Sequence, residues 1–221
     1  MPARRPSTLS SIDHQPTMSD HLITDIASLE ALFGAVAAPS LAKETGHLHP
    51  VYARWIEHAQ FALLATSGAH GLDISPRGDP GPLARIVDEH TLLLPERRGN
   101  NRIDSLRNLI ADPRIGLIFL IPGVGETLRV RGRAEISVDP GLLESFAAEG
   151  KRPTCVLRVA IDKVFFQCAR SILRSRLWHR EEHDTANVPT PGTILAALTQ
   201  GGIDGQSYDS ALPKRQRESL Y

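Results

Sequence analysis

The chain has 221 residues, of which 41% are apolar and 5% aromatic, so it is long enough to bury one sizeable core. Its 25 lysines and arginines balance 25 aspartates and glutamates, and no chain-wide field therefore attracts nucleic acid or anionic lipid. Residues 1–20 are polar, carry three prolines and show no periodicity. We expect this segment to be disordered.

No apolar run approaches the roughly 18 residues of a membrane-spanning helix, and the N-terminus has no apolar signal segment. The two cysteines, Cys155 and Cys168, are too few for a disulfide scaffold and lie in or next to an apolar segment. We therefore expect reduced, buried thiols in a cytoplasmic protein that binds neither nucleic acid nor membrane.

Helical spacing of apolar residues predicts two short N-terminal helices, in "ITDIASLEALFGAV" (residues 23–36) and "HPVYARWIEHA" (residues 49–59). They open a main domain expected at residues 21–180. The remaining residues, 181–221, form a polar extension in which "GTILAALTQ" predicts one short helix.

Between these ends, short strand-like runs are separated by turn signals such as "SGAHG" and "PGVGE". The runs cover residues 61–67, 74–78, 83–87, 91–95, 115–121, 127–136 and 154–168. Only two helical stretches interrupt them, Asn101 to Ala111 and about Pro140 to Glu149. The pattern indicates a mostly β barrel of antiparallel strands with helices at its edges.

The strand "TLRVRGRAEI" alternates apolar and small residues with Arg129, Arg131, Arg133 and Glu135. Such a period of two is typical of a strand with one wet or ligand-facing side. The arginines either line a ligand cleft or face water, and the pattern alone does not decide between these readings.

The stretch "PERRGNNRIDSLRN" places four arginines around the expected start of a helix. We expect Asn100 or Asn101 to cap this helix and Arg102 to lie in its first turn. A basic residue beside the positive end of a helix dipole is unfavourable unless an anion lies between them. The stretch therefore predicts an anion site, and the alternative is an ordinary turn with solvated arginines.

A second motif, "SPRGD" at residues 75–79, follows a strand-like run. A meander brings Arg77 close to Arg102, and Gly78 allows a close approach of the backbone. Two guanidinium groups, a helix N-terminus and the Ser105 hydroxyl would form a phosphate cradle. Taken alone, "SPRGD" is also compatible with a surface turn.

With these motifs in place, the chain resembles the pyridoxamine 5′-phosphate oxidase-like family of FMN-binding split barrels. The resemblance runs from about Ile23 to Trp178 and is carried by "SPRGD", "LLLPERRGNNRIDSLRN", "GLIFLIPGVGETLRVRGRA" and "RSRLW". It implies a six-stranded antiparallel split β-barrel that forms a homodimer, with FMN bound at the subunit interface.

The resemblance also implies roles for individual residues. The positions that match the FMN phosphate site are Arg77, Asn101, Arg102 and Ser105, with Gly78 and Asn100 beside them. Leu94 and Pro95 match the segment that lines the isoalloxazine ring. Thr127 matches a flavin contact supplied by the other subunit, and Gln167 lies at the position of a flavin-contacting tryptophan.

The implied function is an FMN-dependent oxidoreductase that passes electrons from a donor such as a nicotinamide cofactor to a small molecule. Arg174 and Arg176 are the candidates for binding an anionic substrate. The Arg-x-His substrate motif of pyridoxamine 5′-phosphate oxidase itself is not matched by "RSRLWHR", so vitamin B6 oxidation is not implied. The alternatives are a flavin- or haem-binding module without turnover, and a structural dimer.

One further string, "HREEH" at residues 179–183, matches the H-x-x-E-H pattern of zinc peptidases. That pattern requires both histidines on one face of a buried helix. Because this segment is polar on all sides and is followed by Pro189 and Pro191, we expect a solvated segment and no metal site.

Overall fold

The computed structural model describes residues 21–69 and 71–220. The expected disorder of residues 1–20 therefore concerns a segment outside the described residues. The chain divides into two compact units, Met1–Ala42 and Lys43–Tyr221. The division thus falls after Ala42, whereas the sequence suggested a boundary near residue 20.

The described residues of the first unit include two short α-helices, α1 (Ile26–Phe33) and α2 (Ala38–Ala42). Asp25 caps α1 by accepting a hydrogen bond from the Ser28 N–H at 2.9 Å. The helix ends at Gly34, whose φ of 69° is accessible to glycine without steric cost.

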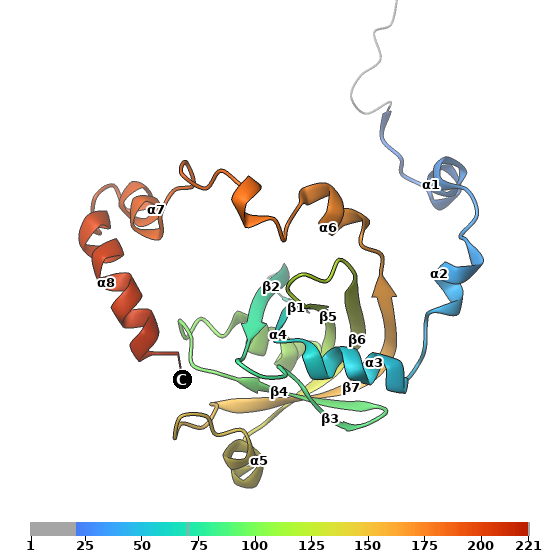
Figure 1. Ribbon diagram of the computed structural model, residues 1–221, viewed down its shortest axis with the longest axis horizontal. Helices are drawn as coiled ribbons and strands as arrows, with labels where there is room; N and C mark the ends of the chain where they lie inside the picture. Colours follow the sequence, from blue (N-terminus) through green and yellow to red (C-terminus); the bar gives the residue numbers. More distant parts are fainter. Residues whose placement is uncertain (1–20, 70, 221) are drawn as a thin grey trace, which may run out of the picture. The chain divides into compact units, whose positions relative to one another are not determined.

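The second unit alternates strands with short helices (Figure 1). Its elements up to the end of the sheet are α3 (Pro50–His58), β1 (Phe61–Gly68), β2 (Gly71–Gly78), β3 (Arg85–Asp88), β4 (Thr91–Glu96), α4 (Asp104–Ala111), β5 (Arg114–Leu120), β6 (Thr127–Ser137), α5 (Pro140–Ser145) and β7 (Cys155–Gln167). The protein is therefore mostly β with helices at the edges of the sheet, as the sequence predicted.

All strand pairs are antiparallel, in the order β2-β1-β5-β6-β7-β4-β3. The sheet has seven strands, so the expectation of six strands was wrong. The additional strand is the short β3. This strand pairs with β4 across a tight turn at residues 89–90. Three of its four residues lie in the strand-like run 83–87 that the sequence showed.

The sheet is strongly curled. In the pairing order β2 and β4 lie five places apart, yet the Arg77 Nε on β2 is 2.6 Å from the Glu96 Oε1 on β4. A flat sheet with strands about 4.8 Å apart would separate them by more than 20 Å. The curl therefore brings β2, the first strand in the pairing order, next to β4, the sixth.

One face of the curled sheet forms the core. Strand residues of one parity are fully buried, while their neighbours along each strand are half-buried or exposed. Ile56 of α3 and Leu109 of α4 join this core and close it at its edges. The Asn108 side chain also donates a 3.1 Å hydrogen bond to Thr66 Oγ1, which fixes α4 against β1.

A bulge interrupts the β6–β7 ladder between Arg131 and Gly132. A Cβ at position 132 would lie 2.1 Å from the carbonyl oxygen of Ala160. Only glycine allows this approach of the two backbones, so Gly132 is the residue that permits the bulge.

The chain beyond the sheet contains α6 (Arg170–Ser175), a short 3₁₀ helix (η2, Arg180–Glu182), α7 (Pro191–Leu198) and α8 (Gly205–Glu218). The expectation of one short helix in residues 181–221 was therefore wrong. The expected helix corresponds to α7. The sequence did not reveal α8, because this helix is polar and contains Pro213. Within the described part of the chain, no helix has the length and apolar character needed to cross a membrane.

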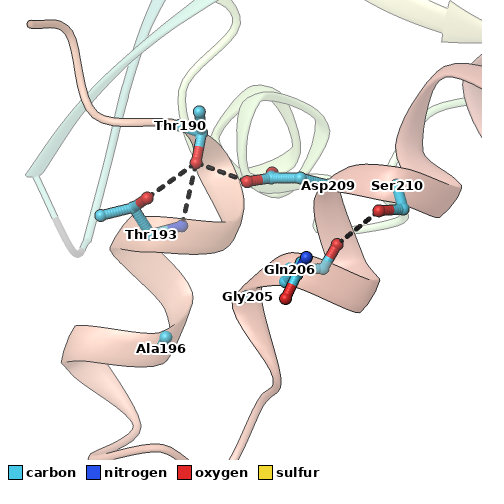
Figure 2. Close-up of a pocket in the computed structure, with 7 residues that line it drawn as sticks. All are labelled: Thr190, Thr193, Ala196, Gly205, Gln206, Asp209 and Ser210. Atoms are coloured by element: carbon cyan, nitrogen blue, oxygen red, sulfur yellow. Dashed lines mark hydrogen bonds between the residues drawn. The ribbon is translucent and has the colours of Figure 1, made fainter.

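Helices α7 and α8 form a hairpin that packs through glycines. A Cβ at Gly192 would lie 2.1 Å from the Gly205 carbonyl oxygen, so the two helices touch backbone to backbone. Asp209 of α8 accepts hydrogen bonds from the Gly192 N–H at 2.7 Å and from Thr190 Oγ1 at 2.5 Å. Figure 2 shows these polar side chains turned toward one another. They satisfy each other, and we assign no ligand to the hollow between the helices.

Candidate anion site at the end of strands β2 and β4

A polar row follows one face of β2. Asp73, Ser75 and Arg77 are half-buried, whereas Leu72 and Ile74, at the alternate positions, are exposed. Since alternate residues of a strand face opposite sides, the polar row points into the curl of the sheet. Asp79, just after the strand, continues the same alternation.

Arg77 is the centre of this row. Its Nε donates to Glu96 Oε1 at 2.6 Å, and its Nη1 donates to Ser75 Oγ at 2.6 Å and to the Pro76 carbonyl at 3.0 Å. Its Nη2 lies 3.4 Å from Ser105 Oγ, at the start of α4. Three hydrogen bonds from Nε and Nη1 thus fix the orientation of the guanidinium, and its Nη2 edge faces α4.

Glu96 was not identified from the sequence, although it is the strongest partner of Arg77. Burial raises the pKa of Glu96, and the neighbouring Arg77 opposes this rise. The buried carboxylate lies opposite Cys155 in the β4–β7 ladder. Burial, reinforced by Glu96, raises the pKa of the Cys155 thiol to about 11. Cys155 is a free, buried thiol, as expected.

Ser105 links α4 to the polar row. The residue is buried, and its hydroxyl donates a 2.5 Å hydrogen bond to Asp73 Oδ2. Arg77 and Asp73 of β2 therefore both contact this hydroxyl. The structure confirms that Arg77 and Ser105, predicted from two separate motifs, lie side by side.

The start of α4 differs from the prediction. The helix begins at Asp104, and its N-cap is Ile103, which forms no side-chain cap hydrogen bond. Asn101 and Ile103 have φ values of 58° and 52°, so the chain is left-handed just before the helix and the predicted start at Asn101 was wrong. A left-handed β-branched residue such as Ile103 is strained, and such strain is typical of functional turns.

Asn100, Asn101 and Arg102 therefore precede the helix. Asn100 does not cap α4, and its side chain instead accepts a 3.1 Å hydrogen bond from the Arg102 N–H. Arg102 is largely exposed, and its Nε donates to Asp104 Oδ2 at 2.8 Å. Among the described residues, no hydrogen bond or ion pair joins the Arg102 guanidinium to Arg77 or Ser105, so the two predicted arginines are not in contact within one chain.

A second ion pair lies beside Arg77. Arg97 Nη2 is 2.7 Å from Asp79 Oδ2, and its Nη1 donates to the Phe146 carbonyl at the end of α5. Two adjacent pairs, Arg77 with Glu96 and Asp79 with Arg97, thus connect the ends of β2 and β4. Both pairs are mostly shielded from water, which holds the two strand ends in a fixed relation.

The remaining strand residues predicted for the cofactor lie along the same curl. Leu94 and Pro95 are buried in β4, directly before Glu96, whereas Gly78 is exposed at the end of β2. Leu94 lies in the core, so only its backbone is open to a cofactor role.

Thr127 and Gln167 form a separate pair. They lie directly opposite each other where β6 begins and β7 ends. Thr127 is buried and Gln167 half-buried. No hydrogen bond among the described residues joins this pair to Arg77 or Ser105. Within one chain the predicted cofactor residues therefore form two groups.

The segment "RSRLW" lies next to the loop that leads into Thr127. The Trp178 Nε1 donates a 2.7 Å hydrogen bond to the Val124 carbonyl in the loop between β5 and β6. Arg174 is exposed in the last turn of α6. Arg176 forms an ion pair with Glu182 and has a φ of 53°. Arg174 thus has the more open side chain of the two substrate candidates.

The histidine-rich string forms no built metal site. His179, Glu181 and Glu182 lie close together and are exposed, and Glu182 is already paired with Arg176. Exposed acidic groups of this kind are common without an ion.

Cys168 is half-buried, which corrects the expectation of two buried thiols. A hydrogen bond from the Arg170 Nε lowers the pKa of the Cys168 thiol.

The protein is thus a small, mostly β protein whose curled antiparallel sheet brings a half-buried arginine next to a buried serine, at a helix start without a side-chain cap. The chain belongs to the pyridoxamine 5′-phosphate oxidase family, whose sequence profile matches residues 48–168. This span begins just before α3 and ends just after β7. The family expected from the sequence is therefore confirmed.

Solved structures with a similar fold include HupZ from Group A Streptococcus, with 22% identity and a TM-score of 0.42 over 51% of this chain and 89% of that chain. A putative pyridoxamine 5′-phosphate oxidase from Lactobacillus delbrueckii has 21% identity and a TM-score of 0.43 over 55% and 95%. An FMN-binding protein from Syntrophomonas wolfei has 13% identity and a TM-score of 0.39 over 50% and 78%. A search of curated proteins gave no match.

Proposed function

We propose that this protein is an FMN-binding flavoprotein that acts as an FMN-dependent oxidoreductase on a small substrate. The observation that carries the proposal is the position of Arg77, whose Nη2 edge faces the Ser105 hydroxyl and the start of α4. A phosphate needs donors of this kind, namely guanidinium N–H groups, a hydroxyl and free backbone N–H groups.

The residues present fit a flavin phosphate. The helix start has no side-chain cap, so its first N–H groups remain available to an anion. Arg77, Asn101, Arg102 and Ser105 would hold the phosphate, with Gly78 and Asn100 beside them and the backbone of Leu94 and Pro95 along the ring. Membership of the family supports a flavin, and the choice of FMN is part of the proposal.

The two groups of cofactor residues support a homodimer. In this proposal, Thr127 and Gln167 of one subunit approach the phosphate group held by Arg77 of the other. Exposed apolar residues on the outer face of β2, Leu72 and Ile74, are suited to such a contact. The six strands of a split barrel would correspond to the sheet without β3.

When bound, the flavin supplies the redox chemistry by accepting and releasing a hydride or electrons. The residues of this chain bind and orient it. Glu96 keeps the Arg77 guanidinium in one orientation, and Asp73 does the same for the Ser105 hydroxyl. Arg174, and with it Arg176, would bind the anionic part of the substrate.

The first test is the visible absorption spectrum of the purified protein, followed by chromatography of any chromophore released by heat. If the proposal is right, the protein is yellow and releases FMN in an amount equimolar with the protein chain. A colourless protein that does not bind added FMN would reject it. Steady-state assays with reduced nicotinamide cofactors then separate an enzyme, which turns over, from a flavin-binding module, which does not.

A mutation tests the phosphate assignment. Arg102→Ala is expected to weaken FMN binding about tenfold or more, because it removes a charge-assisted contact of about 1.5–3 kcal/mol. The fold should be unaffected, since Arg102 is exposed and its pair with Asp104 is a surface ion pair. Fluorescence titration with FMN measures the effect.

Arg107→Ala is the matched control. Arg107 is also exposed and also lies near Asp104, at 3.6 Å, but one turn further into α4. It should bind FMN like the unmodified protein. Equal FMN affinity in the Arg102 and Arg107 variants would remove Arg102 from the site.

A further inference from the structure

The outer face of β6 carries arginines that the phosphate site does not use. Arg129, Arg131 and Arg133 alternate with the buried residues Val130 and Gly132. Because alternate residues share a face, the three arginines form one row on the side of the sheet away from the core. The row begins two residues after Thr127.

Two cross-strand pairs on this face join like charges. Arg131 lies opposite Lys163 of β7, and Arg133 lies opposite Arg114 of β5. Like charges directly opposite each other destabilise an antiparallel pair. Negative charge on this face would therefore stabilise the sheet.

The carboxylates of this chain supply only part of that charge. Glu44 lies 2.5 Å from Lys163, which lowers the pKa of Glu44, with smaller contributions from Arg131 and Lys43. Asp112 accepts hydrogen bonds from Arg114, and its pKa falls to about 2. Both carboxylates are thus held by the flanking cations. Among the described residues, no ion pair reaches Arg129 or Arg131.

Arg129 and Arg131 are held in place by an aromatic ring. The Phe165 ring centroid is 5.0 Å from the Arg129 guanidinium carbon and 5.9 Å from that of Arg131. Cation–π contacts of this kind orient the planar groups without using their N–H donors. The donors remain available to a phosphate or carboxylate, which arginine binds with two parallel hydrogen bonds.

The pair also adjoins the proposed flavin contact. In the β6–β7 ladder, the pair Arg129 and Phe165 lies two residues along from the pair Thr127 and Gln167. Two residues along a strand correspond to about 7 Å, which is within the length of a small metabolite.

We propose that Arg129 and Arg131, placed over Phe165, form an anion-binding subsite for a small ligand with at least two negative charges, carried by phosphate or carboxylate groups. The anion site itself follows from the charges and contacts of this face. Its assignment to the substrate of the flavoprotein rests on the proposed function. This assignment places the anionic part of the substrate at β6. Arg174 and Arg176, at the end of α6, remain further candidates for binding it.

The test is calorimetric titration of the purified protein, with any flavin it retains, with pyrophosphate and with citrate at constant ionic strength. The unmodified protein should bind at least one of these anions. The double variant Arg129→Gln, Arg131→Gln should bind it about tenfold or more weakly, because charge-assisted hydrogen bonds are lost. Preference for pyrophosphate or citrate distinguishes a phosphate ligand from a polycarboxylate.

Arg158→Gln is the control. Arg158 is an exposed arginine of β7 that lies opposite Glu135, eight residues along β6 from Thr127. Its loss should leave the anion affinity unchanged. If the double variant has a lower unfolding midpoint, the single variant Arg131→Gln, at an exposed side chain, replaces it.

Two results would overturn the subsite: no binding of either anion, or equal anion affinity in the unmodified protein and the double variant. If equal affinity is accompanied by loss of dimerisation in the double variant, the arginines belong to a subunit contact. Flavin content, measured on the same samples, is a separate readout. Absence of flavin with anion binding lost in the double variant would reject the proposed function and support the anion site.

Discussion

Replacement of Arg77 by alanine is expected to lower the free energy of unfolding by about 3 kcal/mol at neutral pH and to abolish FMN binding. Removal of one member of a buried ion pair costs about 3–5 kcal/mol, because the other charge remains in the interior. Here the remaining charge is Glu96, whose side chain is slightly more shielded from water than that of Arg77. Urea denaturation and FMN titration measure the two effects.

The stability loss should depend on pH. Burial raises the pKa of Glu96, and without Arg77 the attraction that opposes this rise is lost. A carboxyl group with a folded pKa above its unfolded value binds more protons in the folded state, so stability falls as pH rises. The deficit of the Arg77→Ala variant should be complete above the raised pKa. It should diminish as pH falls and be absent below the ordinary value of 4.5.

The double variant Arg77→Ala, Glu96→Gln is the control for this explanation. This variant leaves no unpaired charge in the interior. It should therefore recover most of the lost stability at neutral pH while remaining unable to bind FMN. A deficit of equal size in both variants, unchanged between neutral and acidic pH, would show that Arg77 stabilises the fold by packing and not by its pairing with Glu96.

The sequence predicted the cationic half of this site but not its acidic half. "SPRGD" and "GNNRIDSLRN" identify Arg77 and Ser105 because the arginines stand out beside a helix start. Glu96 and Asp73 were missed because a carboxylate beside a phosphate site is unexpected on charge alone. Their roles depend on the curl of the sheet, which no local pattern shows. The period-two row of Asp73, Ser75 and Arg77 was the available signal.

The strands were predicted closely because alternation and turn residues are local properties. The start of α4 was not, since left-handed φ values at Asn101 and Ile103 are imposed by the surrounding structure against the preference of a β-branched residue. Helix α8 was missed for a different reason. Its stability comes from contacts with α7 and from Asp209, not from an apolar stripe in its own sequence.

Gly132→Ala is expected to lower the free energy of unfolding by about 3 kcal/mol, at the upper end of the usual cost of overpacking. The added Cβ would meet the Ala160 carbonyl oxygen at 2.1 Å, and this atom belongs to the backbone of the adjacent strand and cannot rotate away. The β6–β7 ladder must therefore open at the bulge. Thermal and urea unfolding measure the loss.

Gly116→Ala is the matched control. Gly116 belongs to β5 and lies opposite Arg131 of β6, and a Cβ added there would meet only the Ala65 Cβ, at 3.8 Å. Alanine is better than glycine within a strand by about 0.5–1 kcal/mol, so this variant should be as stable as the unmodified protein or slightly more stable. Equal stability of the two alanine variants would mean that the close approach at Gly132 is not required.

The same substitution connects the fold with the anion subsite. The register shift at Gly132 separates Arg131, opposite Lys163, from Arg133, opposite Ala160. Opening of the ladder at this point should move Arg131, which is next to the bulge, relative to Phe165, whereas Arg129 lies two residues further from the bulge and keeps its partner. Gly132→Ala should therefore weaken anion binding while Gly116→Ala does not. Unchanged anion affinity in a destabilised Gly132→Ala protein would show that Arg129 binds the anion without Arg131.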